Sequence, residues 1–123
     1  MYIKDDYVPF ETAMLMDKHG YESLSDIAYD KDGEMFNALN EPFRDVECYT
    51  PTIANALKWL REAHGLYADV FVIDYAPEPW IANIHKYNDE IEMVTVYHHS
   101  GEFFKTYEDA ANYIIGVCLE KYM

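Results

Sequence analysis

Two amphipathic segments with helix signals at both ends enclose the middle of the chain, and they constrain its fold more than any other feature. The first, TPTIANALKWLREAHG (50–65), has Thr50 as a candidate N-cap, Pro51 at the first helical position and Gly65 as its stop. Its apolar side recurs at the i, i+3, i+4, i+7 spacing of one helix face: Ile53, Ala56, Leu57 and Leu60. We expect a helix here with one buried side.

The second segment, TYEDAANYIIGVCLEKYM (106–123), opens with Thr106 as a candidate N-cap and carries acidic side chains in its first turn. Its apolar stripe consists of Tyr107, Ala110, Ala111, Ile114, Cys118 and Tyr122. Gly116 in the middle of a helix costs about 1 kcal/mol relative to alanine. We therefore expect Gly116 to mark a close contact between the helix and a sheet.

Between these helices, residues 69–98 have the composition of three antiparallel strands. The segment APEP (76–79) is the candidate link between the first two strands, and a tight turn there would pair Asp69 with Lys86. One sheet face then collects Phe71, Ile73, Tyr75, Trp80, Ala82, Ile84, Ile91, Met93 and Tyr97. We expect the two long helices to cover this face.

The second and third strands carry a turn signal at Asn88-Asp89, and a two-residue turn there would pair Tyr87 with Glu90 and His85 with Glu92. The opposite sheet face then mixes polar with apolar side chains: Val70, Val72, Asp74, Ile81, Asn83, His85, Glu92, Val94, Val96 and His98. A half-apolar face that stays exposed is typical of a contact surface. The residues of this candidate interface are Val70, Val72, Ile81, Asn83, Val94, Val96 and His98.

The N-terminal part predicts a short helix followed by a hairpin. In VPFETAMLMDKHGY (8–21), Pro9 suits a first helical position and Gly20 a stop, and the buried side would be Phe10, Ala13, Met14 and Met16. Lys31-Asp32-Gly33 is a strong turn signal between two strand-like runs, and residues 40–50 read as an irregular connection.

These elements predict an α+β fold in one domain, residues 1–123, with the order α-β-β-α-β-β-β-(β)-α. We expect an antiparallel sheet of three to five strands with helices packed on one face.

The amino-acid composition limits the classes of partner that the protein is expected to bind. Twenty-three acidic residues against nine Lys and Arg give a formal charge of −14, which disfavours direct binding to nucleic acid and to anionic membranes. The N-terminus lacks the apolar stretch of a signal peptide, and no apolar run approaches membrane-spanning length. Cys48 and Cys118 lack metal-site spacing and read as free buried thiols. A cytoplasmic protein without a cofactor is expected.

The expected strand register brings His85, Glu92 and Asp74 to one face, which makes them weak candidates for a metal site. His98 shares that face but lies roughly 20 Å from His85 at normal strand rise, too far to bind the same ion. A cross-strand ion pair between His85 and Glu92 is the simpler interpretation. No catalytic residue is assigned.

The segment VYHHSGEFF (96–104) holds two adjacent histidines, a serine and a glutamate. In a strand, His98 and His99 would point to opposite faces and could not serve one site. Ser100 has no positioned base in the sequence pattern, and Ser100-Gly101 reads as a turn into the last helix.

The order of TAMLMDKHGY, the hairpin around DKDGE, TPTIANALKWLREAHG and KTYEDAANYIIGVCLEKYM resembles a family of small uncharacterised proteins of gut bacteria, their phages and mobile elements. The segment from Pro51 to Gly65 carries the most specific part of this resemblance. The resemblance implies an intracellular accessory protein. It brings no activity, ligand or functional residue with it.

Three functions follow as hypotheses. A non-enzymatic protein-binding or regulatory module, or a homodimer formed through the half-apolar face, fits the sequence best. An acidic mimic of nucleic acid, bound by a nucleic-acid-binding protein, is the first alternative. A small metal-dependent enzyme using His85, Glu92 and Asp74 is the second.

Overall fold

The computed structural model describes residues 2–23, 25–73, 77–99 and 101–123. Within these ranges, three α-helices and two three-stranded antiparallel sheets form an α+β structure, so the predicted class is confirmed. The strands are divided between two sheets, whereas a single sheet was expected. The chain separates into two compact units, 1–56 and 57–123, and each is described by itself. The expectation of a single domain stays a prediction.

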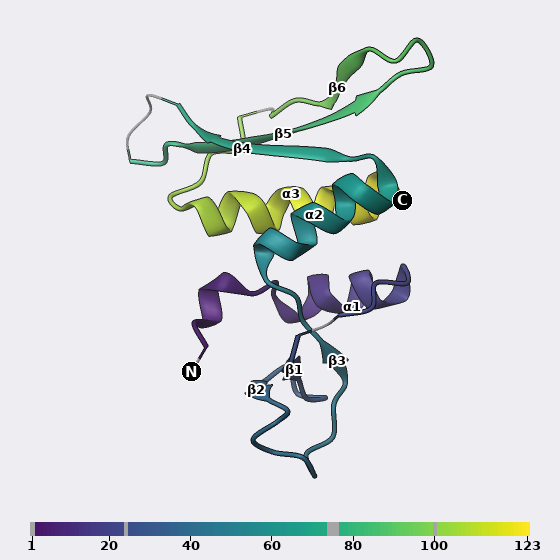
Figure 1. Ribbon diagram of the computed structural model, residues 1–123. Coiled ribbons are helices and arrows are strands. Elements are labelled where there is room, and N and C mark those ends of the chain that lie inside the picture. Colours follow the sequence, from purple (N-terminus) through teal and green to yellow (C-terminus); the bar gives the residue numbers. More distant parts are fainter. Residues whose placement is uncertain (1, 24, 74–76, 100) are drawn as a thin grey trace. The chain divides into compact units, whose positions relative to one another are not determined.

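The N-terminal unit combines helical turns with a small sheet (Figure 1). Its elements are the 3-10 helix η1 (Lys4–Asp6), α1 (Phe10–Lys18), β1 (Ile27–Tyr29), β2 (Met35–Asn37) and β3 (Cys48–Tyr49). The strand order is β2-β1-β3, with Ala28 paired to Phe36 on one side and to Tyr49 on the other. The hairpin of β1 and β2 was predicted. The two-residue strand β3 lies where an irregular connection was expected.

Local signals set the ends of α1. Its N-cap is Pro9, and the chain leaves the helix at Gly20, whose φ of +87° is a conformation that glycine adopts without steric cost. Ala13 and Met16 are buried as predicted. Met14 is 36% exposed, so its predicted burial is wrong; one position past Ala13, it lies about 100° around the helix from the buried side.

The backbone of Val8 holds three segments of this unit together. Its N–H donates to the carbonyl of Pro51 at 3.1 Å, and its carbonyl oxygen accepts from two buried hydroxyls, Tyr29 Oη and Thr50 Oγ1, each at 2.7 Å. Thr50 is therefore not the N-cap of the next helix. Thr52 has that role, because its Oγ1 accepts from the N–H of Asn55 at 3.1 Å.

The second unit contains a meandering sheet with a helix packed against it. After α2 (Ile53–His64), which spans the boundary between the units, come β4 (Tyr67–Val72), β5 (Trp80–Tyr87), β6 (Met93–Tyr97) and α3 (Tyr107–Lys121). The strand order is β4-β5-β6. Figure 1 shows α2 and α3 on the same side of this sheet, as predicted.

The predicted end of α2 at Gly65 and the predicted start of α3 at Thr106 are confirmed. Gly65 follows α2 with φ +64°, and Thr106 Oγ1 accepts from the N–H of Asp109 at 3.1 Å at the start of α3. The contact expected at Gly116 is wrong, because a Cβ atom placed there would meet nothing within 4 Å. Cys48 and Cys118 are free and buried, as predicted.

The expected register between β4 and β5 is wrong by three residues. Asp69 pairs with Asn83 instead of Lys86, because the connection between the strands is longer than a tight turn: Ile73 N–H donates to the Pro79 carbonyl at 2.7 Å. An odd shift moves the side chains of one strand to the other face. The β4 side chains that share a face with Ala82 and Ile84 are therefore Ala68, Val70 and Val72.

The register between β5 and β6 is also shifted by three residues, so Tyr87 pairs with Met93 instead of Glu90. A register break between Ile84 and His85 then brings Tyr97 opposite Ile84. This bulge restores Tyr97 to the helix side, where its hydroxyl lies 2.9 Å from that of Tyr113 in α3. The expected face of Tyr97 is confirmed, although the expected pairing is wrong.

Candidate functional site

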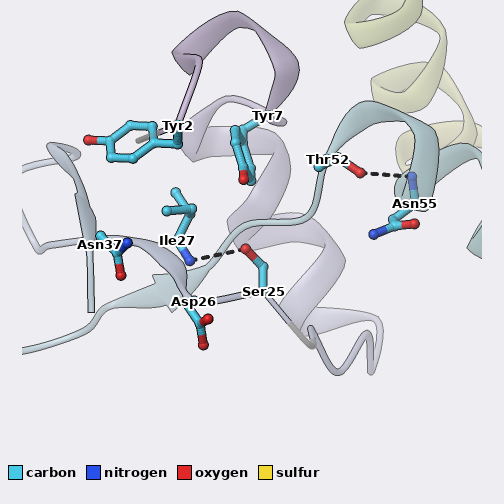
Figure 2. Close-up of a pocket in the computed structure, with 8 residues that line it drawn as sticks. All are labelled: Tyr2, Tyr7, Ser25, Asp26, Ile27, Asn37, Thr52 and Asn55. Carbon is cyan, nitrogen blue, oxygen red and sulfur yellow. Dashed lines mark hydrogen bonds between the residues drawn. The ribbon is translucent and has the colours of Figure 1, made fainter. Parts of the chain in front are cut away.

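A pocket of about 370 Å³ opens on the N-terminal unit, and it is the clearest candidate site in the described part of the chain (Figure 2). Its lining comes from the N-terminal segment, the strands β1 and β2 and the start of α2: Tyr2, Tyr7, Ser25, Asp26, Ile27, Asn37, Thr52 and Asn55. Every one of these residues belongs to unit 1–56. The pocket is therefore complete within one unit.

Two tyrosine rings form the aromatic part of the lining. The ring centroids of Tyr2 and Tyr7 lie 6.2 Å apart with the planes at 87°, an edge-to-face arrangement. The Tyr2 hydroxyl donates to the carbonyl of Met35 at 3.2 Å, and the backbone of Tyr7 pairs with Thr52. These contacts tie both tyrosines to the sheet and to the start of α2.

The small polar side chains of the lining are oriented by backbone donors. Ser25 Oγ accepts from the N–H of Ile27 at 3.0 Å, and Asn37 Oδ1 accepts from the N–H of Leu39 at 3.0 Å. Thr52 Oγ1 is fixed as the helix cap. Since each oxygen is held by one donor, the serine and threonine hydroxyls and the asparagine amide keep further hydrogen-bonding capacity for a ligand.

Asp26 brings the only charge to the described lining, which contains no Lys, Arg or His. Its side chain is exposed, and across the described ranges no basic side chain forms an ion pair with it. Figure 2 shows the carboxylate on the far side of Ile27 from the tyrosine rings. Aromatic faces, neutral oxygens and one carboxylate suit an ammonium or guanidinium group.

The metal site considered from the sequence is not assembled. His85 pairs with Thr95, whose Oγ1 lies 2.9 Å from His85 Nδ1, while His85 Nε2 lies 3.7 Å from an Asp69 carboxylate oxygen. Glu92 lies in the turn after β5, so its expected pairing with His85 is wrong. Asp74 lies outside the described residues. Within the described ranges, no three His, Cys, Asp or Glu side chains are grouped to hold a metal ion.

The candidate interface residues lie on different faces of the sheet, because the registers differ from those expected. Val70, Val72 and Val94 pair with Ala82, Trp80 and Lys86, whereas the neighbouring Ile81 and Asn83 point to the opposite face. Ile81 and Asn83 are buried, and Val72 is 56% exposed. Val96 is half-buried at the bulge, and His98 is exposed. An interface in this region stays a prediction.

His98 and His99 do not lie on opposite faces, because β6 ends at Tyr97. Their rings stack with centroids 4.5 Å apart, and His98 Nδ1 lies 2.9 Å from the carbonyl oxygen of His99. The N–H of His99 donates to Asn83 Oδ1 at 2.9 Å, which explains why a buried asparagine is tolerated in β5. Ser100 lies outside the described residues, and Gly101 has φ +86°.

A hydrogen-bonded triangle that the sequence did not reveal links β6 to α3. The hydroxyls of Tyr97 and Tyr113 donate to Glu102 Oε1 at 2.8 and 2.9 Å, and the two hydroxyl oxygens lie 2.9 Å apart. Burial and these hydrogen bonds raise the pKa of Tyr97 above its ordinary value. Lys121 Nζ lies 5.7 Å from the centroid of the Tyr97 ring. The cluster is internally bonded and serves as a link between elements.

No family model matches the chain, and no curated protein or solved structure is similar to it. No helix in the described ranges combines the length and the apolar character that crossing a membrane requires. The interpretation of the candidate site therefore rests on the geometry of the pocket alone. Sequence reasoning missed the pocket because its lining comes from separated segments; the abundance of tyrosine was the only available signal.

Proposed function

We propose that this protein is a small binding module that receives a cationic group of a partner protein in the pocket of its N-terminal unit. One observation carries the proposal: Tyr2, Tyr7 and Asp26 line the same pocket, with the Asp26 carboxylate on the other side of Ile27 from the rings (Figure 2), and the described lining holds no basic residue. A volume of about 370 Å³ suits a side chain or a small amine. The hydroxyls and amides of the lining would orient the bound group.

The negative net charge of the chain favours a partner with basic segments. The chain has a formal charge of −14, so its field attracts cationic segments and repels acidic ones over several ångströms of solution. Asp5 and Asp6 belong to η1, shortly after Tyr2 in the sequence, and they add negative charge to the same N-terminal segment. Long-range attraction would raise the association rate, and Asp26 would fix the final position of the cation.

The cellular setting is part of the same proposal. A cytoplasmic accessory protein agrees with the two free buried thiols and with the resemblance to small proteins of gut bacteria and phages. Mimicry of nucleic acid remains a prediction, because it needs acidic side chains gathered on one surface of the whole chain.

Calorimetric titration with a short glycine-serine peptide carrying one arginine tests the pocket. A matched peptide carrying citrulline keeps the shape and hydrogen-bonding capacity and removes the charge. We expect saturable binding of the arginine peptide only. Equal heats from the two peptides would contradict a cation site.

Two variants locate the binding. Asp26→Asn should weaken affinity for the arginine peptide by roughly tenfold or more, since hydrogen bonds to charged groups contribute about 1.5–3 kcal/mol. Asp32→Asn removes the same charge from the exposed turn between β1 and β2, outside the pocket lining. If Asp26→Asn and Asp32→Asn weaken binding equally, only the overall charge matters and the pocket is not the site.

A further inference from the structure

The N-terminal unit has a second pocket, of about 220 Å³, whose lining shares no residue with the first pocket of Tyr2, Tyr7 and Asp26. Its lining comes from the last turn of α1, from the segment that follows this helix and from β3: Asp17, Tyr21, Glu22, Ser23 and Tyr49. Every one of these residues belongs to unit 1–56. Both pockets are therefore parts of the same unit.

The second pocket repeats the chemistry of the first. Two tyrosines, one serine and two carboxylates line it, and the described lining contains no Lys, Arg or His. Within the described ranges, no basic side chain forms an ion pair with Asp17 or Glu22. Tyr49 is 44% exposed, so part of its side chain is accessible to a ligand. Aromatic rings beside carboxylates that have no ion-pair partner suit an ammonium or guanidinium group.

The end of α1 contributes to the second pocket through its backbone as well. The N–H of Tyr21 donates to the carbonyl of Met16 at 3.0 Å, which holds the chain against the last turn of the helix. The C-terminus of a helix is the negative end of its dipole and favours a nearby cation. Although Lys18 and His19 follow Asp17 in the sequence, neither lines the pocket.

One short segment supplies lining residues to both pockets. Residues 21–23 line the second pocket, and residues 25–27 line the first. The N–H of Ser25 donates to Ser23 Oγ at 3.1 Å, so a lining residue of one pocket is hydrogen-bonded to a lining residue of the other. The chain from Ser23 to Ser25 spans at most about 7 Å. Cations bound in the two pockets would therefore be within reach of one peptide segment.

We propose that the two pockets are adjacent subsites for two cationic side chains of one partner segment, with Asp26 in the first and Asp17 and Glu22 in the second. This inference rests on the proposed function and extends it from one bound cation to two. The three carboxylates repel one another while no cation is bound, and a ligand with two positive charges offsets that repulsion. Once one cation is bound, the other enters its pocket at a raised effective concentration. The partner is thus a segment with two Arg or Lys residues a few positions apart.

Calorimetric titration of the unmodified protein with glycine-serine peptides, capped at both ends, tests the inference. Each peptide carries two arginines separated by a spacer of neutral residues, which is lengthened one residue at a time, and two matched controls replace either arginine by citrulline. We expect at least one spacing at which the two-arginine peptide binds roughly tenfold or more tighter than both controls, with one peptide per chain. A gain of no more than about fourfold at every spacing, the statistical advantage of two arginines and two independent pockets, overturns the inference.

Variants of the second pocket locate the second arginine. Asp17→Asn and Glu22→Gln each remove one charge from an exposed side chain that lines this pocket. Each should weaken binding of the two-arginine peptide by roughly tenfold. Asp32→Asn, which removes the same charge outside both linings, should have a much smaller effect. Equal losses in all three variants overturn the inference, because only the overall charge would then matter.

The same titrations distinguish a failure of this inference from a failure of the proposed function. If the single-arginine peptides bind, if Asp26→Asn weakens them and if no spacing gives a gain, the first pocket keeps its function and the second pocket is not a subsite. If no arginine peptide binds at all, the proposed function and this inference both fail. The peptide series needs no variant, so it gives a decision even if a substitution prevents folding.

Discussion

Gly33 and Ile91 occupy the same position of the same turn in two different hairpins. The N–H of each donates at 3.0 Å to the carbonyl three residues before it, from Asp30 and Asn88 respectively. Both residues have a positive φ, +78° for Gly33 and +61° for Ile91. A left-handed conformation is routine for glycine and costly for a β-branched residue.

The rest of the turn is shared as well. Asp30 Oδ1 accepts from the N–H groups of Asp32 and Glu34 at 2.9 and 3.0 Å. Asn88 Oδ1 accepts in the same way from the N–H groups two and four residues later, both at 2.9 Å. One side-chain oxygen at the first position therefore organises each turn.

Replacing Ile91 with glycine and Gly33 with isoleucine should change the stability of the protein in opposite directions. Ile91→Gly should raise the free energy of unfolding by about 0.5–1 kcal/mol, because the relief of left-handed strain exceeds the added freedom of glycine in the unfolded chain. Gly33→Ile should lower it by about 2 kcal/mol, since a Cβ there would also lie 3.1 Å from Cδ2 of Phe10. Urea denaturation measures both, and a loss of stability in Ile91→Gly would contradict the strain.

Gly116→Ala should stabilise the protein by about 1 kcal/mol, because the position lies inside α3 and has open space for a Cβ atom. Gly65→Ala is the matched control: space is equally open there, but φ is +64°. That variant should lose about 1 kcal/mol. Thermal unfolding of the pair separates helix propensity from backbone conformation, and a destabilised Gly116→Ala would reveal a contact at Gly116.

Asp30 should make the N-terminal unit sensitive to acid. Its carboxylate lies 2.6 Å from the Arg44 guanidinium, and this hydrogen bond, with those from the turn backbone, holds the pKa of Asp30 below its ordinary value of 3.8. A lowered pKa in the folded state gives stability that is present above about pH 4 and is lost as pH falls through the folded value. We expect the unfolding midpoint in urea to fall over that range.

Asp30→Asn tests this interpretation, because asparagine fills the same position in the second turn and can keep the backbone hydrogen bonds. The variant should be less stable at pH 7 and should lose less stability on acidification. Asp32→Asn is the control for the removal of one charge. Identical pH profiles for Asp30→Asn and the unmodified protein would show that the pair with Arg44 contributes nothing.

The two thiols should resist modification in the folded protein. Burial raises the pKa of Cys48 to about 11, with the nearby charges of Asp17 and Glu47 adding to the effect, and burial raises that of Cys118 to about 12. At pH 8 almost no thiolate is present. A disulfide reagent should therefore label both residues only after denaturation, and rapid labelling of either one in buffer would contradict the burial.

The sequence predicts elements whose limits are set by neighbouring residues. The stops at Gly20 and Gly65 and the cap at Thr106 are local chemistry, and they are where they were expected. The two strand registers failed for physical reasons as well. Between β5 and β6, Ile91 occupies a position that usually requires glycine, so the longer turn gave no visible signal. Between β4 and β5, the connection is longer than a tight turn and closes through the bond from the Ile73 N–H to the Pro79 carbonyl. These two errors, each of three residues, divided the predicted interface between two faces of the sheet.

The pocket could not be predicted from the sequence, for a different reason. Tyr2, Ser25, Asn37 and Asn55 come from separate segments. The pairing of β1 with β2 and β3, the Tyr7–Thr52 bridge and the bond from the Tyr2 hydroxyl to the Met35 carbonyl bring these segments together. Contacts between residues so distant in sequence leave no periodic pattern to read. The same applies to Thr50. It was a candidate N-cap, whereas in the structure its buried hydroxyl donates to the carbonyl of Val8.

The backbone of Val8 determines how the N-terminal unit can assemble. Its hydrogen-bond partners lie 21 and 42 residues away for the carbonyl, so this junction closes only when three distant segments have met. Contacts of such sequence separation slow folding, because the entropy of closing the intervening loops is lost before the contacts form. Deleting residues 1–8 would therefore remove the acceptor of the buried Tyr29 hydroxyl and leave the Thr50 hydroxyl only its longer bond of 3.4 Å to the Pro51 carbonyl.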